Sequence, residues 1–179
     1  MKPGATEALK TFWALDLDSP HKGWREPPWP GPAREQAVVA TVGDTFYLIS
    51  GDELEAGPLG KPVLKYLRDA YAYTPARGWR RLADLPRATE TALSPAPVTP
   101  GGRLLVISGD DGTRVHLDGP DHPGFPRDIF AYDTAADRWE IVGEAPVLIA
   151  NVPSATWRGN WIAVCRRCSV SGCQHCGTA

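Results

Sequence analysis

Short runs of alternating apolar and polar residues recur along this chain, and Gly, Pro and Asp separate them. Residues 71–74 read YAYT, residues 130–133 read FAYD, and residues 13–16 read WALD. Alternation with a period of two, bounded by turn-forming residues, is typical of β-strands. The pattern therefore predicts an all-β chain of many short strands.

The strand pattern belongs to a longer repeat. The sequence Ser-Gly-Asp, a long loop, a strand and a Trp occurs twice, at offsets of 109 − 51 = 58 for Gly51 and Gly109 and 139 − 79 = 60 for Trp79 and Trp139. A period that steady in a β-rich chain indicates the blades of a propeller. We expect Trp24, Trp79 and Trp139 to lie on outermost strands and to pack between neighbouring blades.

Each repeat predicts a four-stranded antiparallel meander. After each Trp come a Pro-containing bend and two apolar strands joined by a Gly-bearing turn, in residues 37–51, 91–109 and 151–165. The chain thus predicts two full blades plus two half blades. A propeller closes with about four to eight blades, so we expect an incomplete ring with open strand edges at its end blades.

The domain organisation follows from the limits of the repeat. Residues 1–10 are an N-terminal extension, residues 11–164 form the partial propeller, and residues 165–179 are a tail that we expect to lie outside the fold. The tail holds all four cysteines: Cys165, Cys168, Cys173 and Cys176. Only four residues separate its two Cys-x-x-Cys pairs, which favours incidental cysteines over a zinc site, a disulfide or a redox centre.

Charge and hydropathy exclude several partners. The formal net charge is −2 and the pI is near 6.1, so we expect no nucleic-acid partner and no polybasic membrane surface. No apolar run approaches the ~20 residues of a membrane span, and we expect no membrane partner. The sequence predicts no cofactor and no metal ligand, and it leaves the cellular compartment open.

Charged residues gather near two kinds of loop that should open on one face. In a meander, the loop between strands two and three lies on the same face as the loop into the next blade. The two longest such loops are residues 51–68 and 109–127, and long loops often carry function. The candidate ligand-binding residues on or beside these loops are Arg34, Arg87, Glu90, Asp110, Asp111 and Arg127.

Two readings of these charges stay open. Arg34 and Arg87 occupy near-equivalent places in the repeat, and together they could form a clamp for a substrate carboxylate. Alternatively, Arg87 with Glu90, and Arg127 with Asp128, bridge adjacent loops and serve the structure alone.

Several phrases resemble the Kelch-repeat propellers of the N-acetylneuraminate epimerase (sialic acid mutarotase) type. They are the two Ser-Gly-Asp sequences, PPWPGPAR at residues 27–34 and HPGFPRD at residues 122–128. The resemblance covers residues 11 to about 164. It implies a sialic acid or other carbohydrate ligand and an acid–base opening and closing of the sugar ring.

The resemblance also points to a missing motif. In that family the general base is a Glu within Gly-Glu-x-x-Pro-Gly-x-Arg, after the second strand of a blade. The matching place here follows Val164 and reads CRRCSVSGCQHCGTA. We expect a frameshifted or split gene, no catalytic residue in this chain, and no mutarotation by the chain alone. The alternatives are a non-enzymatic Kelch module that binds carbohydrate or protein, and association of chains through their end blades.

Overall fold

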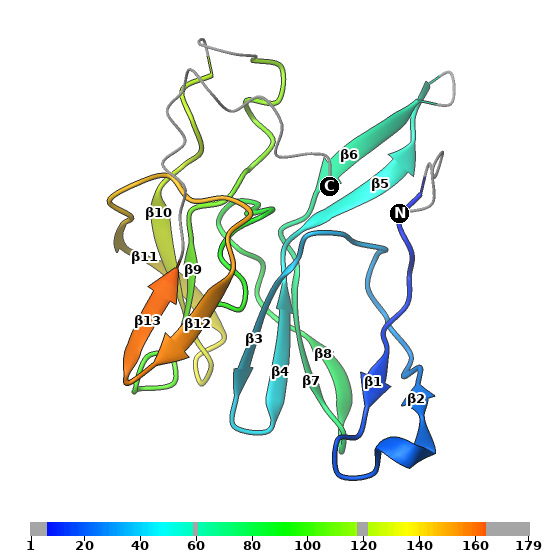
Figure 1. Cartoon of the computed structure of the whole chain (residues 1–179). Coiled ribbons are helices and arrows are strands. Elements are labelled where there is room, and N and C mark those ends of the chain that lie inside the picture. The colour runs from blue at the N-terminus through cyan, green and yellow to red at the C-terminus, as the bar shows by residue number, and fades with distance from the viewer. Residues whose placement is uncertain (1–6, 59–60, 118–121, 164–179) are drawn as a thin grey trace. The chain divides into compact units, whose positions relative to one another are not determined.

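The protein is described by a computed structural model that covers residues 7–58, 61–117 and 122–163. These residues form β-strands and one 3-10 helix, η1 (Pro20–Lys22). The strands are β1 (Ala14–Leu15), β2 (Trp24–Arg25), β3 (Val38–Val42), β4 (Thr45–Ile49), β5 (Asp52–Ala56), β6 (Pro62–Tyr66), β7 (Ala70–Thr74), β8 (Gly78–Arg81), β9 (Leu104–Ile107), β10 (Asp128–Asp133), β11 (Arg138–Glu144), β12 (Ser154–Trp157) and β13 (Asn160–Ala163) (Figure 1). The Cys-rich tail at residues 165–179 lies outside the described residues.

The chain divides into two compact units. The smaller unit comprises Met1–Glu35 and Asp52–Lys65, and the larger comprises Gln36–Gly51 and Tyr66–Ala179. The smaller unit contains the β1–β2 hairpin, which we call the first blade, and the β5–β6 hairpin. The first blade shows two antiparallel strands, as the pattern of a half blade predicts.

The second blade is the four-stranded meander that the repeat predicts. Its strand order is β3-β4-β7-β8, with every neighbouring pair antiparallel. Gly43 makes the turn between β3 and β4 at a φ of 54°, a conformation that glycine adopts at little cost. Val38 and Ala40 alternate inward along β3, which is the two-residue period read from the sequence.

The expected long loop after β4 contains the β5–β6 hairpin. Lys65 Nζ lies 2.8 Å from Glu55 Oε1 and 3.2 Å from Glu53 Oε2, so oppositely charged side chains face one another across this hairpin. Cross-strand ion pairs stabilise exposed hairpins modestly. The sequence of β5, DELEA, is mostly polar. Its alternation of apolar and polar residues is too weak to distinguish a strand from a loop.

The third blade follows the predicted path but has three strands, in the order β11-β10-β9. The segment expected to form its first strand, near residues 91–98, makes only single bridges, such as Val98 with Leu104. Pro95 and Pro97 interrupt it, and proline has no N–H to donate to a strand ladder. The backbone of this segment still runs beside β9, because Leu105 N–H donates to the Pro97 carbonyl at 2.9 Å.

The fourth blade is the half blade that the sequence predicts. Its strands β12 and β13 pair antiparallel, with Ser154 opposite Ala163 and Trp157 opposite Asn160. A small cluster of buried residues from the third blade and the segment before β12 packs beneath it. This cluster comprises Leu93, Ile107, Ala145 and Ile149, with Trp161 and Ala163 packed against it.

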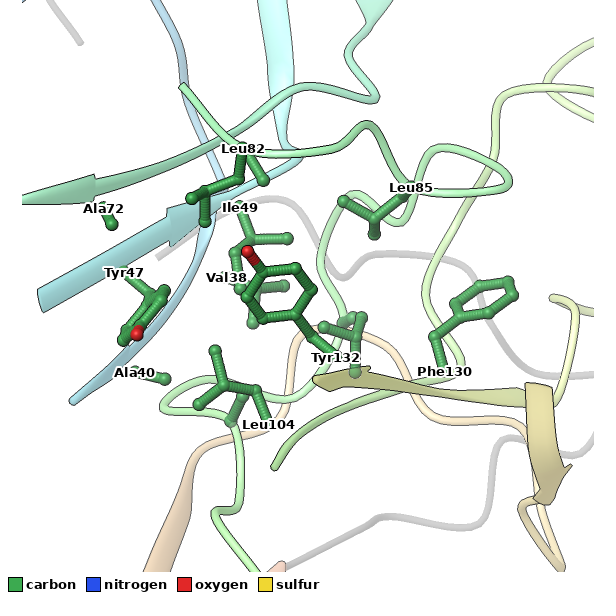
Figure 2. Close-up of a cluster of buried hydrophobic side chains, with 14 residues drawn as sticks. Val38, Ala40, Tyr47, Ile49, Ala72, Leu82, Leu85, Leu104, Phe130 and Tyr132 are labelled. Atoms are coloured by element: carbon green, nitrogen blue, oxygen red, sulfur yellow. The ribbon is translucent and has the colours of Figure 1, made fainter. Parts of the chain in front are cut away.

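A larger apolar core lies between the second and third blades. Figure 2 shows the ring of Tyr132 directed toward Val38 and Ile49 of the second blade. All three side chains are essentially inaccessible to solvent. The other core residues are Ala40, Tyr47, Ala70, Ala72, Leu82, Leu85, Ala92, Ala96, Leu104, Val106 and Phe130.

The three Trp residues of the repeat differ in their surroundings. Trp139 packs between blades as predicted, because its Nε1–H donates to the Ala83 carbonyl at 2.9 Å. Trp79 contacts its own blade, with its ring centroid 5.0 Å from that of Tyr73. Trp24 is 64% exposed, and for these two residues packing between blades stays a prediction.

Candidate functional site

The repeated Ser-Gly-Asp motif shapes the loop that follows the second strand of the second and third blades. Ser50 and Gly51 have positive φ angles of 54° and 96°, and the equivalent Ser108 and Gly109 have 61° and 92°. A Cβ on Gly109 would lie 2.9 Å from the Glu90 carbonyl oxygen, so this position requires glycine. The motif therefore encodes a tight reversal of the chain.

Each motif serine joins its own loop to the next repeat. Ser50 Oγ–H donates to the Leu67 carbonyl at 2.8 Å, and the same oxygen accepts the Thr89 N–H at 2.8 Å. In the next repeat, Ser108 Oγ–H donates to the Pro126 carbonyl at 2.8 Å and accepts the Ile149 N–H at 2.9 Å. Each serine thus ties the end of the long loop in its own repeat to the start of the next repeat.

The two loop types meet through a backbone pair that the repeat duplicates. In the larger unit, Glu90 N–H donates to Asp110 O and Asp110 N–H donates to Glu90 O, both at 2.8 Å. In the smaller unit, Glu35 and Asp52 exchange the same two bonds at 2.8 and 3.1 Å. Each pair brings two carboxyl-bearing residues to one place in its repeat.

Asp52 is the most perturbed acid of the smaller unit. Its side chain is fully buried, and within the described residues neither carboxylate oxygen has a hydrogen-bond partner. Burial, with a contribution from the negative charge of Glu35, raises the pKa of Asp52 to about 6. Asp52 borders the long loop at residues 51–68 and matches Asp110 in the repeat, but it is not among the ligand-binding residues predicted from the sequence.

Arg87 is held by four contacts in the larger unit. Its Nε donates to Asp128 Oδ2 at 3.0 Å, and its guanidinium carbon lies 5.1 Å from the Phe130 ring centroid. Nη1 also donates to the Ala88 carbonyl at 2.9 Å, and Nη2 to the Ser108 carbonyl at 3.4 Å. These contacts match a structural role more closely than that of a cation open to a ligand carboxylate.

Arg127 and Asp111 also have partners within their own repeat. Arg127 Nη2 lies 2.8 Å from Glu144 Oε2, so this arginine joins the start of β10 to the end of β11. Asp111 Oδ1 accepts the Thr113 N–H at 3.0 Å and the Thr113 hydroxyl at 2.7 Å. Burial raises the pKa of Asp111, but the hydrogen bonds from Thr113 and the charges of Arg87 and Arg114 outweigh burial, so the net shift is downward.

The three remaining candidates differ in their surroundings: one lies in a turn, one is buried and one contacts an aromatic ring. Asp110 Oδ1 accepts the Gly112 N–H at 2.9 Å. Glu90 is buried, with 5% of its surface exposed. Arg34, in the smaller unit, places its guanidinium 5.0 Å from the Trp29 ring centroid. A carboxylate clamp of Arg34 and Arg87 stays a prediction.

A cavity of about 310 Å³ opens in the larger unit, where three consecutive repeats approach their first strands. It is lined by four polar and four apolar residues: Gln36, Thr91, Ser94, Asn151, Ala37, Ala92, Val152 and Pro153. None of them is among the candidate residues predicted from the sequence. The repeat carries a signal for three of them, because Gln36, Thr91 and Asn151 all follow its Pro bend, but the prediction rested on charged residues.

Among the residues that the structure describes, no three His, Cys, Asp or Glu side chains lie close enough together to hold a metal ion. No helix in residues 7–58, 61–117 or 122–163 is long and apolar enough to cross a membrane.

The chain is similar in sequence to curated proteins of known name. No family model matches it. It is 26% identical over 172 residues to an N-acetylneuraminate epimerase of Yersinia enterocolitica, a match that covers 81% of this chain and 43% of that protein. It is 31% identical over 110 residues to the N-acetylneuraminate epimerases of Brucella suis and Brucella melitensis, covering 59% of this chain and 27% of each relative. The chain therefore spans less than half the length of these curated relatives.

A solved structure supports the fold independently. The structure of YjhT superimposes with a TM-score of 0.67 at 15% sequence identity, covering 89% of this chain and 60% of that one. Together with the antiparallel blades, this likeness defines the chain as a segment of a Kelch-type β-propeller. Within that class its sequence is similar to the N-acetylneuraminate epimerases, which confirms the resemblance expected from the Ser-Gly-Asp repeats.

Proposed function

We propose that this chain binds a carbohydrate of the sialic acid type on the loop face of its propeller blades and does not interconvert the sugar anomers by itself. The similarity to N-acetylneuraminate epimerases over 81% of the chain carries the choice of ligand. The cavity of the larger unit supplies uncharged polar groups for such a ligand.

The lack of catalysis rests on what the reaction requires. Opening the sugar ring needs a base for the anomeric hydroxyl, a proton donor for the ring oxygen and a cation for the carboxylate. No Gly-Glu-x-x-Pro-Gly-x-Arg stretch occurs among these 179 residues. Arg87 and Arg127 are already paired with Asp128 and Glu144. Without that stretch, the proposal includes sugar binding and leaves out proton transfer.

The test separates binding from turnover. Saturation-transfer NMR on the purified chain with N-acetylneuraminate is expected to show transfer to the sugar protons. Glucose, which lacks the carboxylate and the acetamido group, serves as the control and is expected to give weaker transfer. Equal transfer to the two sugars, or none to either, would contradict the proposal.

A second candidate is a non-enzymatic module that associates with another chain through its fourth blade. The observation in its favour is apolar exposure, because Trp157 is 58% exposed and Ile162 is 41% exposed on β12 and β13. Large exposed apolar side chains grouped on one element mark interaction surfaces. Sedimentation velocity of the wild type and Trp157→Glu tests it: association that the substitution abolishes supports this candidate, and a wild-type monomer contradicts it.

A further inference from the structure

Three uncharged side chains occupy one repeated position at the cavity of the larger unit. Gln36, Thr91 and Asn151 lie at offsets of 91 − 36 = 55 and 151 − 91 = 60, close to the blade period. All three line the cavity. Each has a left-handed backbone, with φ angles of 52°, 56° and 53°. L-residues other than Asn and Asp seldom adopt this conformation.

A backbone ladder connects these three residues across consecutive repeats. Asn151 N–H donates to the Thr91 carbonyl at 2.7 Å, and Thr91 N–H donates to the Gln36 carbonyl at 3.4 Å. The main-chain N–H groups of Thr91 and Asn151 are therefore used by the ladder. The side chains at the same positions are left to line the cavity.

The cavity presents both donors and acceptors. Among the described residues, the side-chain amides of Gln36 and Asn151 have no hydrogen-bond partner. Thr91 Oγ1–H donates to the Glu90 carbonyl at 2.7 Å, which leaves its oxygen as an acceptor. Ser94 Oγ accepts the Val39 N–H at 3.2 Å, and its own proton has no acceptor among the described residues.

The chemistry of this lining selects a neutral ligand group. No charged residue stands among those that line the cavity in the described part of the chain, so a carboxylate would find no counter-ion there. Two alanines, a valine and a proline alternate with the polar residues and can pack against C–H groups. A volume of about 310 Å³ lies at the small end of the range of about 300–1,000 Å³ for small-molecule pockets.

We propose that this cavity is a subsite for the neutral, hydroxyl-rich part of the sugar, with Gln36, Thr91 and Asn151 as the residues that bind its hydroxyl groups. The inference rests on the proposed carbohydrate-binding function and adds to it the subsite and its specificity. The carboxylate of an acidic sugar then lies outside the cavity.

Glycine variants test the subsite with little risk to the fold. Gln36→Gly and Asn151→Gly each remove one amide and suit the positive φ of their positions. The matched control is Arg158→Gly, because Arg158 has a φ of 47° in the β12–β13 turn and does not line the cavity. Thermal melts of all three chains establish that the variants fold.

Two probes separate the subsite from the rest of the site. N-acetylneuraminate carries the carboxylate, and its methyl ester keeps the hydroxyl groups but is neutral. Loss of one hydrogen bond to the sugar is expected to weaken binding by about three- to tenfold. Each cavity variant should weaken the acid and the ester by the same factor, while Arg158→Gly leaves both unchanged. In wild-type protein, either ligand should shift the side-chain NH₂ resonances of Gln36 and Asn151.

The outcomes distinguish a failure of the proposed subsite from a failure of the proposed carbohydrate binding. If the wild type binds N-acetylneuraminate while both cavity variants bind it equally well and the NH₂ resonances do not move, the subsite is wrong and carbohydrate binding stands. If the wild type binds neither the acid nor the ester, both fail. A loss confined to the acid would also overturn the subsite, because it would place the carboxylate in the cavity.

Discussion

Ser50 Oγ accepts the backbone N–H of Thr89 at 2.8 Å, a bond between the second blade and the loop that leads into the third. Ser108 makes the same contact one repeat later, with the N–H of Ile149. The motif serine is fully buried in both repeats. A short sequence phrase therefore holds successive blades together, which explains why it recurs with the period of the fold.

Ser50→Ala is expected to lower the free energy of unfolding by about 1–3 kcal/mol, because it leaves the buried Thr89 N–H and Leu67 carbonyl without partners. Chemical denaturation measures the change. Ser19→Ala is the control, because Ser19 makes no side-chain capping bond, and its effect should stay within about 0.5 kcal/mol. Equal effects of the two substitutions would contradict the proposed role of Ser50.

Arg87→Ala is expected to lower the free energy of unfolding by about 2–4 kcal/mol, because it leaves Asp128 without its partner in a partly buried place and removes the contact with Phe130. Arg81→Ala breaks only the exposed pair with Asp84 and should cost less than about 1 kcal/mol. Denaturation curves of both variants check this. An Arg87→Ala chain as stable as the wild type that fails to bind N-acetylneuraminate would restore the clamp reading.

The buried carboxyl of Asp52 predicts a pH dependence. Its pKa is about 6 in the folded chain, against an ordinary value of 3.8, so the folded chain binds more protons between these values. The stability that this group contributes is complete below about pH 4 and is lost as pH rises through about 6. The loss is on the order of 3 kcal/mol, since one pKa unit corresponds to about 1.4 kcal/mol.

Asp52→Asn is therefore expected to stabilise the chain at pH 7 and to flatten the fall in unfolding free energy between pH 4 and pH 6. Asp110→Asn is the matched control in the next repeat. Asp110 accepts a hydrogen bond from Gly112, so removing its charge should not stabilise the chain. An Asp52→Asn chain that is less stable than the wild type at pH 7 would show that the carboxylate is stabilised by its surroundings.

Core packing between the second and third blades predicts a large cavity effect. Leu104 is fully buried in the larger core, and Leu104→Ala is expected to cost about 2–5 kcal/mol. Leu17→Ala, at a residue that is 82% exposed, is expected to change stability by less than about 0.5 kcal/mol. Urea denaturation of both variants provides the measurement.

The sequence pattern predicted the blades well, because two-residue alternation and a fixed period report directly on strands that bury one face. It misplaced the first strand of the third blade, since Pro95 and Pro97 occupy apolar-looking positions yet cannot donate to a ladder. It also read the β5–β6 hairpin as a loop. There, charged side chains such as Lys65 and Glu55 pair across the strands, and Leu54 is the one apolar residue of β5 that is buried.

The candidate site was harder to predict for an electrostatic reason. The sequence shows that Arg87 and Asp128 are charged but not that they lie 3.0 Å apart, so a paired arginine looks like a binding arginine. The reverse holds for Gln36 and Asn151, which the sequence presents as ordinary polar residues. Their left-handed backbone and their place at the cavity emerge only when the repeats are assembled.

The most direct test of the account is the anomer exchange rate of N-acetylneuraminate, measured by NMR exchange spectroscopy with the purified 179-residue chain. The account predicts that the sugar binds and that the exchange rate equals the rate without protein at every protein concentration. An exchange rate that rises in proportion to the protein concentration would contradict it.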